Sequence, residues 1–318
     1  MSPERLEVRR AAELGEEPAP PSYLIDQLWA ERGVGIIGGE PKCGKSFLAL
    51  HLAVAVASGS ACLRRFDVRA PGRVLLFAAE DALSTVHQRL QGITHAAGLR
   101  LQDLDLYLIT APSVRLDLER DRQRLHNTVA HLRPRLLVLD PFVRLHRVDE
   151  NQVAEVAPLL AFLRQIERTF SAAVCLVHHL RKGASHLRSG QALRGSSELH
   201  AWGDSNLYLS RSRERLRLSV EHRAAAAPDD LYLQLPTAGG PLALCLSEPP
   251  IDQGPRSGAA QSPRARVLEV LGGAGEPMTL AALRAAAGMR TQTLCDTLTA
   301  LLADGAVRKS NTGTYHLA

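Results

Sequence analysis

One segment near the start of the chain, residues 39–46, constrains the fold more than any other. It reads GEPKCGKS and matches the pattern G-x-x-x-x-G-K-S in full. The apolar run before it, Gly33–Gly38, predicts a strand, and the residues after it predict a helix that extends to Ser58. A strand, a glycine-rich loop and a helix in this order are typical of a loop that wraps a phosphate group with its backbone N–H groups. The alternative is a glycine turn with an incidental Lys-Ser pair, and the flanking elements argue against it.

Each position of this loop has a chemical task. Lys45 is placed to reach the β- and γ-phosphates of a nucleotide, and the Ser46 hydroxyl is expected to be a ligand of Mg²⁺. We expect the other residues of the segment and Phe47 after it to line the nucleotide site as well: Gly39, Glu40, Pro41, Lys42, Cys43, Gly44 and Phe47. The sequence thus predicts binding of ATP together with Mg²⁺.

Two further apolar runs end in carboxylates. Asp140 ends LLVLD and is expected to hold Mg²⁺ through water, although many buried strands also end in Asp at a turn. Glu80 follows VLLFAA, a strand that we expect to neighbour the phosphate loop, where a carboxylate can orient water for attack on the γ-phosphate. The alternative is that Glu80 or Asp81 only caps the helix that follows.

Two adjacent histidines, His178 and His179, end another apolar run. We expect this strand to lie next to the strand that ends in Asp140, so that its tip points at the same γ-phosphate. A side chain there can sense hydrolysis and relay it to the segment that follows. A metal site made by both histidines is not expected, because consecutive side chains on a strand face opposite ways.

Apolar runs and amphipathic segments alternate from residue 22 to residue 247. Apolar runs without alternation, separated by helical segments, predict an α/β fold whose mostly parallel sheet is buried on both faces. The expected strands are Gly33–Gly38, Arg73–Ala79, Leu104–Ile109, Arg135–Asp140, Ala173–His178 and Asn206–Leu209, and the expected helices are Gly44–Ser58, Ala82–Ala97, Leu116–His131 and Val153–Thr169. Three more strands, Arg215–Val220, Leu231–Leu235 and Leu242–Leu246, would extend the sheet in antiparallel fashion.

The remaining segments divide the chain further. Residues 1–21 are charged and then proline-rich, which predicts a flexible tail, and residues 248–262 are rich in Pro, Gly and Ser, which predicts a linker. Residues 263–318 predict three helices followed by a β-hairpin and resemble the winged-helix superfamily. Its third helix would present Arg290 and Gln292 to DNA, although winged helices also dock proteins.

The composition limits which compartment and which partners are expected for the protein. The five cysteines are scattered and never at C-x-x-C spacing, which favours a reducing cytoplasm. No run of about 18 apolar residues occurs, so a membrane-spanning protein is not expected. The net charge of +5 is a mild hint of a polyanionic partner.

The four motifs GEPKCGKS, FAAED, LLVLDP and VHHLRKG, in this order, resemble those of the RecA-like ATPases. In detail they are similar to the hexameric replicative helicases of the plasmid RepA, DnaB and phage primase-helicase types. The resemblance covers about residues 22–220 and implies a RecA-like P-loop ATPase core in a homo-oligomeric, hexameric ring. It also implies that Glu80 activates water and that His179, which precedes a leucine as the sensor of these helicases does, senses the γ-phosphate.

The resemblance further implies an arginine that enters the active site of the neighbouring subunit. In the phage and DnaB-like helicases it follows an L-R-G-S stretch, which is present here in LRGSSELHAWGDSNLYLSR. The RepA-type proteins place it a few residues earlier than Arg211, where this chain reads Gly203-Asp204-Ser205. Arg211 is the candidate, with Arg194 and Arg213 as alternatives. An exposed arginine at the edge of the sheet is the competing interpretation of Arg211.

Basic residues directly after His179 suggest where DNA would be contacted. In a ring this segment would face the central channel, where Arg181, Lys182 and Arg188 could follow the phosphates of single-stranded DNA. A solvated surface loop is the alternative. We therefore expect a DNA helicase that acts on single-stranded or forked DNA, and an ATPase that regulates replication or recombination without unwinding stays open. A module that uses ATP only as a switch is a further alternative.

Overall fold

The computed structural model describes residues 8, 10, 22–179, 197–212, 215–235, 242–248, 263–287, 289, 291–310 and 313–317. The chain divides into two units, Met1–Pro249 and Pro250–Ala318. Each unit has its own hydrophobic core, and the two are described separately.

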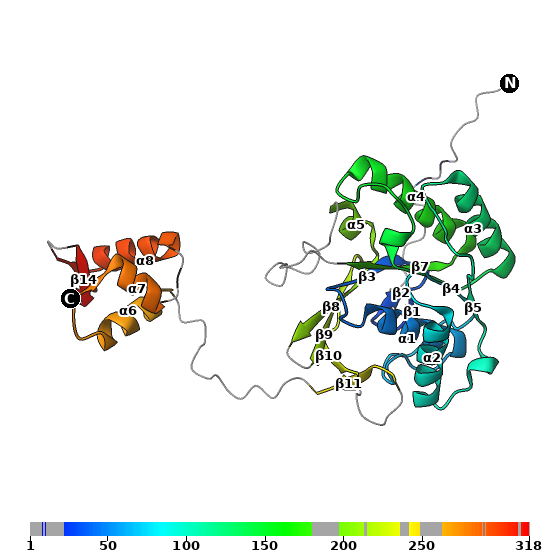
Figure 1. Ribbon diagram of the computed structural model, residues 1–318, viewed down its shortest axis with the longest axis horizontal. Helices are drawn as coiled ribbons and strands as arrows, with labels where there is room; N and C mark the ends of the chain where they lie inside the picture. Colours follow the sequence, from blue (N-terminus) through cyan, green and yellow to red (C-terminus); the bar gives the residue numbers. More distant parts are fainter. Residues whose placement is uncertain are drawn as a thin grey trace, which may run out of the picture. The chain divides into compact units, whose positions relative to one another are not determined.

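The larger unit is built on a nine-stranded sheet, drawn in Figure 1. The strand order is β11-β10-β9-β8-β3-β7-β6-β4-β5, in which β8, β3, β7, β6, β4 and β5 run parallel and β9 to β11 are antiparallel. The bounds are β3 (Val34–Gly39), β4 (Val74–Ala78), β5 (Leu106–Leu108), β6 (Leu136–Asp140), β7 (Ala173–His179), β8 (Ser205–Ser212), β9 (Arg215–His222), β10 (Leu231–Gln234) and β11 (Cys245–Ser247). The predicted α/β fold with a mostly parallel sheet is confirmed.

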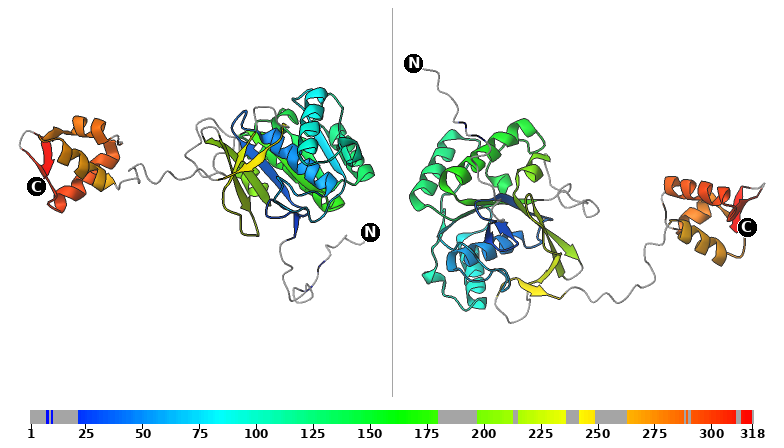
Figure 2. Two further views of the ribbon diagram at one scale, coloured as in Figure 1. Left: turned by 90° about the horizontal axis from the view of Figure 1, so that it is seen from below. Right: turned by 180° about the vertical axis from the view of Figure 1, so that it is seen from behind.

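Helices cover both faces of this sheet. On one face lie α1 (Lys45–Ser58) and α2 (Leu83–Ala96), and on the other lie α3 (Glu119–Leu132), α4 (Val153–Phe170) and α5 (Ser197–Trp202), as Figures 1 and 2 show. Strand β6 shows why its sequence is apolar throughout: Leu136 and Val138 pack on the first face, Leu137 and Leu139 on the second, and all four are fully buried. Among the residues with described structure, no helix has both the length and the apolar character that a membrane crossing needs.

Three details of the larger unit differ from the expected pattern. Two short strands, β1 (Tyr23–Ile25) and β2 (Trp29–Ala30), form an antiparallel pair, and α5 is also additional. Elements this short leave no periodic pattern that a sequence could show. The last strand, expected at Leu242–Leu246, is shorter and lies later, because the residues before it pack against α1: the N–H of Leu244 donates to Nε2 of His51 at 2.8 Å.

In its described residues, the smaller unit combines three helices with a three-stranded sheet of order β12-β14-β13. Its elements are α6 (Pro263–Gly273), β12 (Met278–Thr279), α7 (Leu280–Ala287), α8 (Thr291–Ala303), β13 (Val307–Lys309) and β14 (Thr314–Leu317). Thr279 caps α7, because its Oγ1 accepts a hydrogen bond from the N–H of Ala282 at 3.2 Å. Leucines from α7 and α8 fill the core of the unit. Its assignment to the winged-helix superfamily stays a prediction.

Candidate nucleotide-binding site

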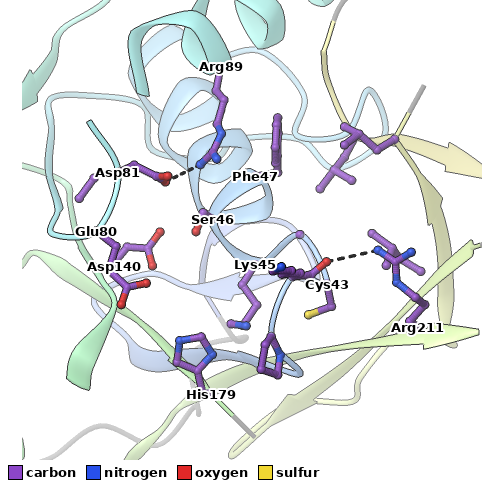
Figure 3. A pocket seen from close by; sticks show the side chains of 17 residues that line it. Cys43, Lys45, Ser46, Phe47, Glu80, Asp81, Arg89, Asp140, His179 and Arg211 are labelled. Carbon is purple, nitrogen blue, oxygen red and sulfur yellow. Dashed lines mark hydrogen bonds and ion pairs between the residues drawn. The ribbon is translucent and has the colours of Figure 1, made fainter. Parts of the chain in front are cut away.

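A pocket of about 600 Å³ lies at the C-terminal ends of β3, β7, β6 and β4. Figure 3 shows it from close by. Most residues predicted from the sequence for a nucleotide site line this pocket: Pro41, Lys42, Cys43, Gly44, Lys45, Ser46, Phe47, Glu80, Asp140, His179 and Arg211. Gly39 and Glu40 directly precede the lining segment. The topology thus brings five separate stretches of sequence to one place.

The loop between β3 and α1 is shaped to receive an anion. Gly44 adopts φ 90°, a left-handed conformation that suits glycine, and its position at the N-cap of α1 brings no side-chain capping bond. The first turn of α1 contains no acidic residue, so its N–H groups and the helix dipole favour a negative ligand. A side chain at Gly39 would lie 2.6 Å from both Cys43 Sγ and the Leu209 carbonyl oxygen, so the tight path of the loop requires glycine there.

Lys45 is the buried cation of this site. Its side chain is directed into the loop, where Nζ donates to the Glu40 carbonyl oxygen at 2.8 Å. Burial lowers the pKa of Lys45, and the nearby acidic groups Asp140 and Glu80 oppose this shift. An ammonium held by a neutral carbonyl gains strongly from a phosphate, which supplies the negative charge that compensates for its burial.

Oxygen ligands suited to Mg²⁺ gather beside the lysine. Asp140 ends β6 and accepts a hydrogen bond from Ser46. Burial raises the pKa of Asp140 to about 6; the hydrogen bond from Ser46 and the charge of Lys45 lower it, and the charges of Asp81 and Glu80 raise it. A hydroxyl and clustered carboxylates are the donor set that Mg²⁺ prefers, and Figure 3 shows Ser46, Glu80 and Asp140 grouped together. The residues present therefore fit the predicted ion.

Glu80 reaches the pocket from a strand in an unexpected position. Its strand was predicted to lie beside the phosphate loop, and this was wrong: β7 and β6 separate β4 from β3. Glu80 lines the pocket nonetheless, because the parallel strands all end at the same edge of the sheet. Its Oε1 accepts a hydrogen bond of 2.8 Å from Nε of Arg144, which lies in the 3-10 turn Phe142–Arg144 after β6.

Asp81 does not cap the helix that follows it. Helix α2 has Ala82 at its N-cap, and no side chain there makes a capping hydrogen bond. Asp81 instead forms an ion pair with Arg89 of α2, and the guanidinium of Arg89 lies 5.0 Å from the centre of the Phe47 ring. Sequence reasoning missed Arg89, because an arginine inside an amphipathic helix has no local feature that marks it as a pocket residue.

The two histidines at the end of β7 face opposite ways, as predicted. β7 pairs with β6 in parallel, which also confirms the expected neighbours. His178 is buried with its ring 6.1 Å from that of Phe142, whereas His179 lines the pocket. His179 is therefore the histidine that can meet a phosphate group.

The opposite end of the pocket is apolar. Leu216 of β9, Leu235 after β10 and Leu244 before β11 line it together with Phe47. Figures 1 and 2 show that β9 to β11 curl toward the face of the sheet that α1 covers. No single motif contains these leucines, so only the pairing of the antiparallel strands could reveal them.

Arg211 lines the pocket of its own chain. It lies on β8 opposite Leu216 of β9, and its Nη2 donates to the carbonyl oxygen of Lys42 at 3.2 Å, as drawn in Figure 3. Gln292 lies in α8. The other residues predicted for arginine and DNA roles fall outside the described residues: Arg181, Lys182, Arg188, Arg194, Arg213 and Arg290.

The sheet topology and the phosphate loop define a RecA-like P-loop ATPase fold. The chain belongs to the AAA domain family, whose model matches residues 2–185. The fold is similar to that of a RadB recombinase, with a TM-score of 0.51 and 18% identity over 69% of this chain and 92% of that chain. It is also similar to that of a DnaB-like replicative helicase, with a TM-score of 0.54 and 13% identity over 69% of this chain and 58% of that chain.

Proposed function

We propose that this protein is a Mg²⁺-dependent ATPase that works as a DNA motor, a ring-forming helicase of the replicative type. The observation that carries the ATPase proposal is the pocket that joins the buried Lys45 to Ser46, Asp140, Glu80 and His179. Such a set of groups suits phosphoryl transfer to water, in which catalysis is mostly positioning and charge stabilisation.

Each residue has a task in this proposal. Lys45 exchanges the Glu40 carbonyl for the phosphates of ATP, and Glu80 orients the attacking water. Ser46 and Asp140 would hold Mg²⁺, which neutralises phosphate charge when bound. His179 contacts the γ-phosphate and reports its loss to the residues that follow β7.

The motor proposal adds DNA and a ring of identical subunits. Its support is the motif resemblance, the net positive charge and the basic residues Arg181, Lys182 and Arg188 directly after His179. In the smaller unit, Arg290 and Gln292 are the proposed DNA contacts of a winged helix.

The ring also needs an arginine that acts across subunits. Because Arg211 lines the pocket of its own chain, we assign it to the nucleotide bound there. The role across subunits then passes to Arg194 or Arg213.

ATP turnover with and without single-stranded DNA tests the proposal. The full chain should hydrolyse ATP faster in the presence of oligo(dT) and should separate a forked duplex. Glu80→Gln should bind ATP and fail in both assays. Stimulated turnover without strand separation would favour the regulator over the helicase. Equally negligible turnover by the wild type and Glu80→Gln would leave only an ATP switch.

A further inference from the structure

The contact between Glu80 and Arg144 has no part in the proposed chemistry so far. Nε of Arg144 holds one carboxylate oxygen of Glu80 at 2.8 Å. A carboxylate that orients water must offer its oxygens to that water, and here one of them accepts a hydrogen bond from a guanidinium instead. The contact therefore opposes the task that we propose for Glu80.

The pair is built so that it can open without disturbing the fold. Arg144 has neighbours Phe142 and Leu145 that are fully buried, which anchors the backbone of the turn. The side chains themselves are open to solvent, 61% exposed for Arg144 and 42% for Glu80. An exposed ion pair of this kind shifts the equilibrium between its closed and open arrangements by no more than about fivefold. Rotation of one side chain is therefore enough to free the glutamate.

The position of Arg144 indicates what would compete for it. Its turn packs against β7, where the Phe142 ring contacts that of His178. β7 ends at His179, directly before the basic residues that we propose as DNA contacts. A guanidinium can donate two parallel N–H bonds to a phosphodiester. We therefore expect Arg144 to bind a phosphodiester more strongly than it binds one oxygen of an exposed carboxylate.

We propose that Arg144 is a positioning residue that keeps Glu80 from orienting the attacking water until a phosphate of single-stranded DNA binds Arg144. DNA binding then frees the glutamate, and ATP hydrolysis becomes coupled to occupancy of the DNA site. This inference rests on the proposed function, since it needs both ATP turnover and a DNA partner.

Turnover of the full chain provides the first test. Arg144→Ala should raise DNA-free kcat about three- to fivefold, reduce the stimulation by oligo(dT) to a similar extent, and leave the KM for ATP unchanged. Arg144→Lys should behave between wild type and alanine, because a lysine keeps the charge without the planar fork. Arg147→Ala, an exposed arginine three residues on, should match wild type. A fall in DNA-free kcat for Arg144→Ala, or an unchanged stimulation ratio, would overturn the proposal. So would DNA-free turnover that rises with protein concentration to the stimulated rate, since a neighbouring copy would then release Glu80.

Binding provides a second test that needs no hydrolysis. Linkage is reciprocal, so loss of the pair from the glutamate side must free Arg144 for DNA. Glu80→Gln should bind fluorescein-labelled oligo(dT) about three- to fivefold more tightly than wild type at low salt. The same change made in Arg144→Ala should give no such gain, which separates the pair from a general loss of negative charge. Equal gains in both backgrounds would reject the pair even if wild type shows DNA-stimulated turnover. If the wild type binds oligo(dT) but does not hydrolyse ATP, the proposed ATPase function is wrong. The binding gains of the Glu80→Gln variants then decide whether Glu80 and Arg144 form the proposed pair.

Discussion

The parallel and antiparallel parts of the large sheet build different ends of one pocket. The parallel strands β7, β6 and β4 each deliver a polar side chain at or just beyond the strand end: His179, Asp140 and Glu80. The antiparallel strands β9 to β11 contribute apolar side chains, of which Leu216 lies within a strand. Parallel strands all end at the same edge of the sheet, so the polar side chains at their ends lie close together there. Antiparallel strands alternate in direction, so their ends do not meet at one edge. Leu216, Leu235 and Leu244 instead form an apolar wall of the pocket, which we call the antiparallel wall.

The largest effect is expected from the charged end of the pocket. Lys45→Ala should lower kcat/KM for ATP about 10³-fold, because it removes the buried cation that meets the phosphates. Phosphate release by the full chain measures this. Lys42→Ala changes an exposed lysine of the same loop and should cost less than about threefold. Similar losses in the two variants would show that the loop needs only general positive charge.

A steric clash between two neighbouring strands of the parallel part, β3 and β8, should destabilise the larger unit. Gly35 lies on β3 against β8, and a Cβ there would come 1.7 Å from the carbonyl oxygen of Ser205. Gly35→Ala should therefore lower the free energy of unfolding by about 3 kcal/mol, the upper part of the range for overpacked sites. Trp29 and Trp202 are the two tryptophans and both lie in this unit, so fluorescence during urea unfolding reports on it.

The matched control for this variant is Gly98→Ala. A methyl group added at Gly98 would meet no atom within 4 Å beyond the adjacent residues, and its φ of 71° is positive. Backbone strain alone should therefore cost about 1 kcal/mol there. Equal losses at Gly35 and Gly98 would contradict the steric argument for the contact between β3 and β8.

The antiparallel wall should show its own pH dependence through His51. Burial lowers the pKa of His51 to about 4 from the ordinary 6.5. In the folded chain Nε2 of the ring accepts the N–H of Leu244. The unfolded chain therefore binds a proton below pH 6.5 that the folded chain excludes. The free energy of unfolding should fall by about 3 kcal/mol from this group as the pH drops from 6.5 to 4.

His51→Gln keeps an acceptor for Leu244 but removes the titrating group. The free energy of unfolding of the wild type, relative to that of this variant, should therefore fall by about 3 kcal/mol between pH 6.5 and pH 4. Urea unfolding at a series of pH values measures it. His131→Gln, at an exposed position of α3, controls for loss of any histidine. Parallel pH profiles for wild type and His51→Gln would show that the ring is free to protonate in the folded chain.

The smallest effect is expected from Arg211, which joins the two ends of the pocket. Arg211→Ala should lower kcat/KM for ATP about tenfold, the worth of one hydrogen bond to a charged group. Because Arg211 lines its own pocket, mixing this variant with Lys45→Ala should not restore turnover. Recovery in the mixture would mean that Arg211 acts on the nucleotide of a neighbouring copy.

Local pattern was enough to predict the charged end of the pocket. The phosphate loop lies between β3 and α1, as the sequence indicated, and Asp140 and His179 each end a strand, as expected. The alternating roles of His178 and His179 also follow from the period of a strand. These features depend on residues close together in the sequence, where chain geometry limits the possible arrangements.

Strand order and side-chain pairing were less accessible. The predicted place of β4 was wrong, since an apolar run shows that a strand is buried and not which strand lies beside it. The alternative role of Asp81 as a helix cap is not found, since Asp81 pairs with Arg89. Both outcomes depend on choices between partners that local pattern leaves equally open.

The sequence alone therefore determined which residues can perform phosphate chemistry, because glycine-rich turns and polar strand ends are encoded over a few residues. Only the tertiary structure decided what surrounds them: the leucine wall from β9 to β11, the Arg144 contact to Glu80 and the place of Arg211 in its own pocket. These contacts join residues far apart in the chain. They form only when the strands of the sheet are arranged in their final order, and the periodicity of the sequence does not encode that order.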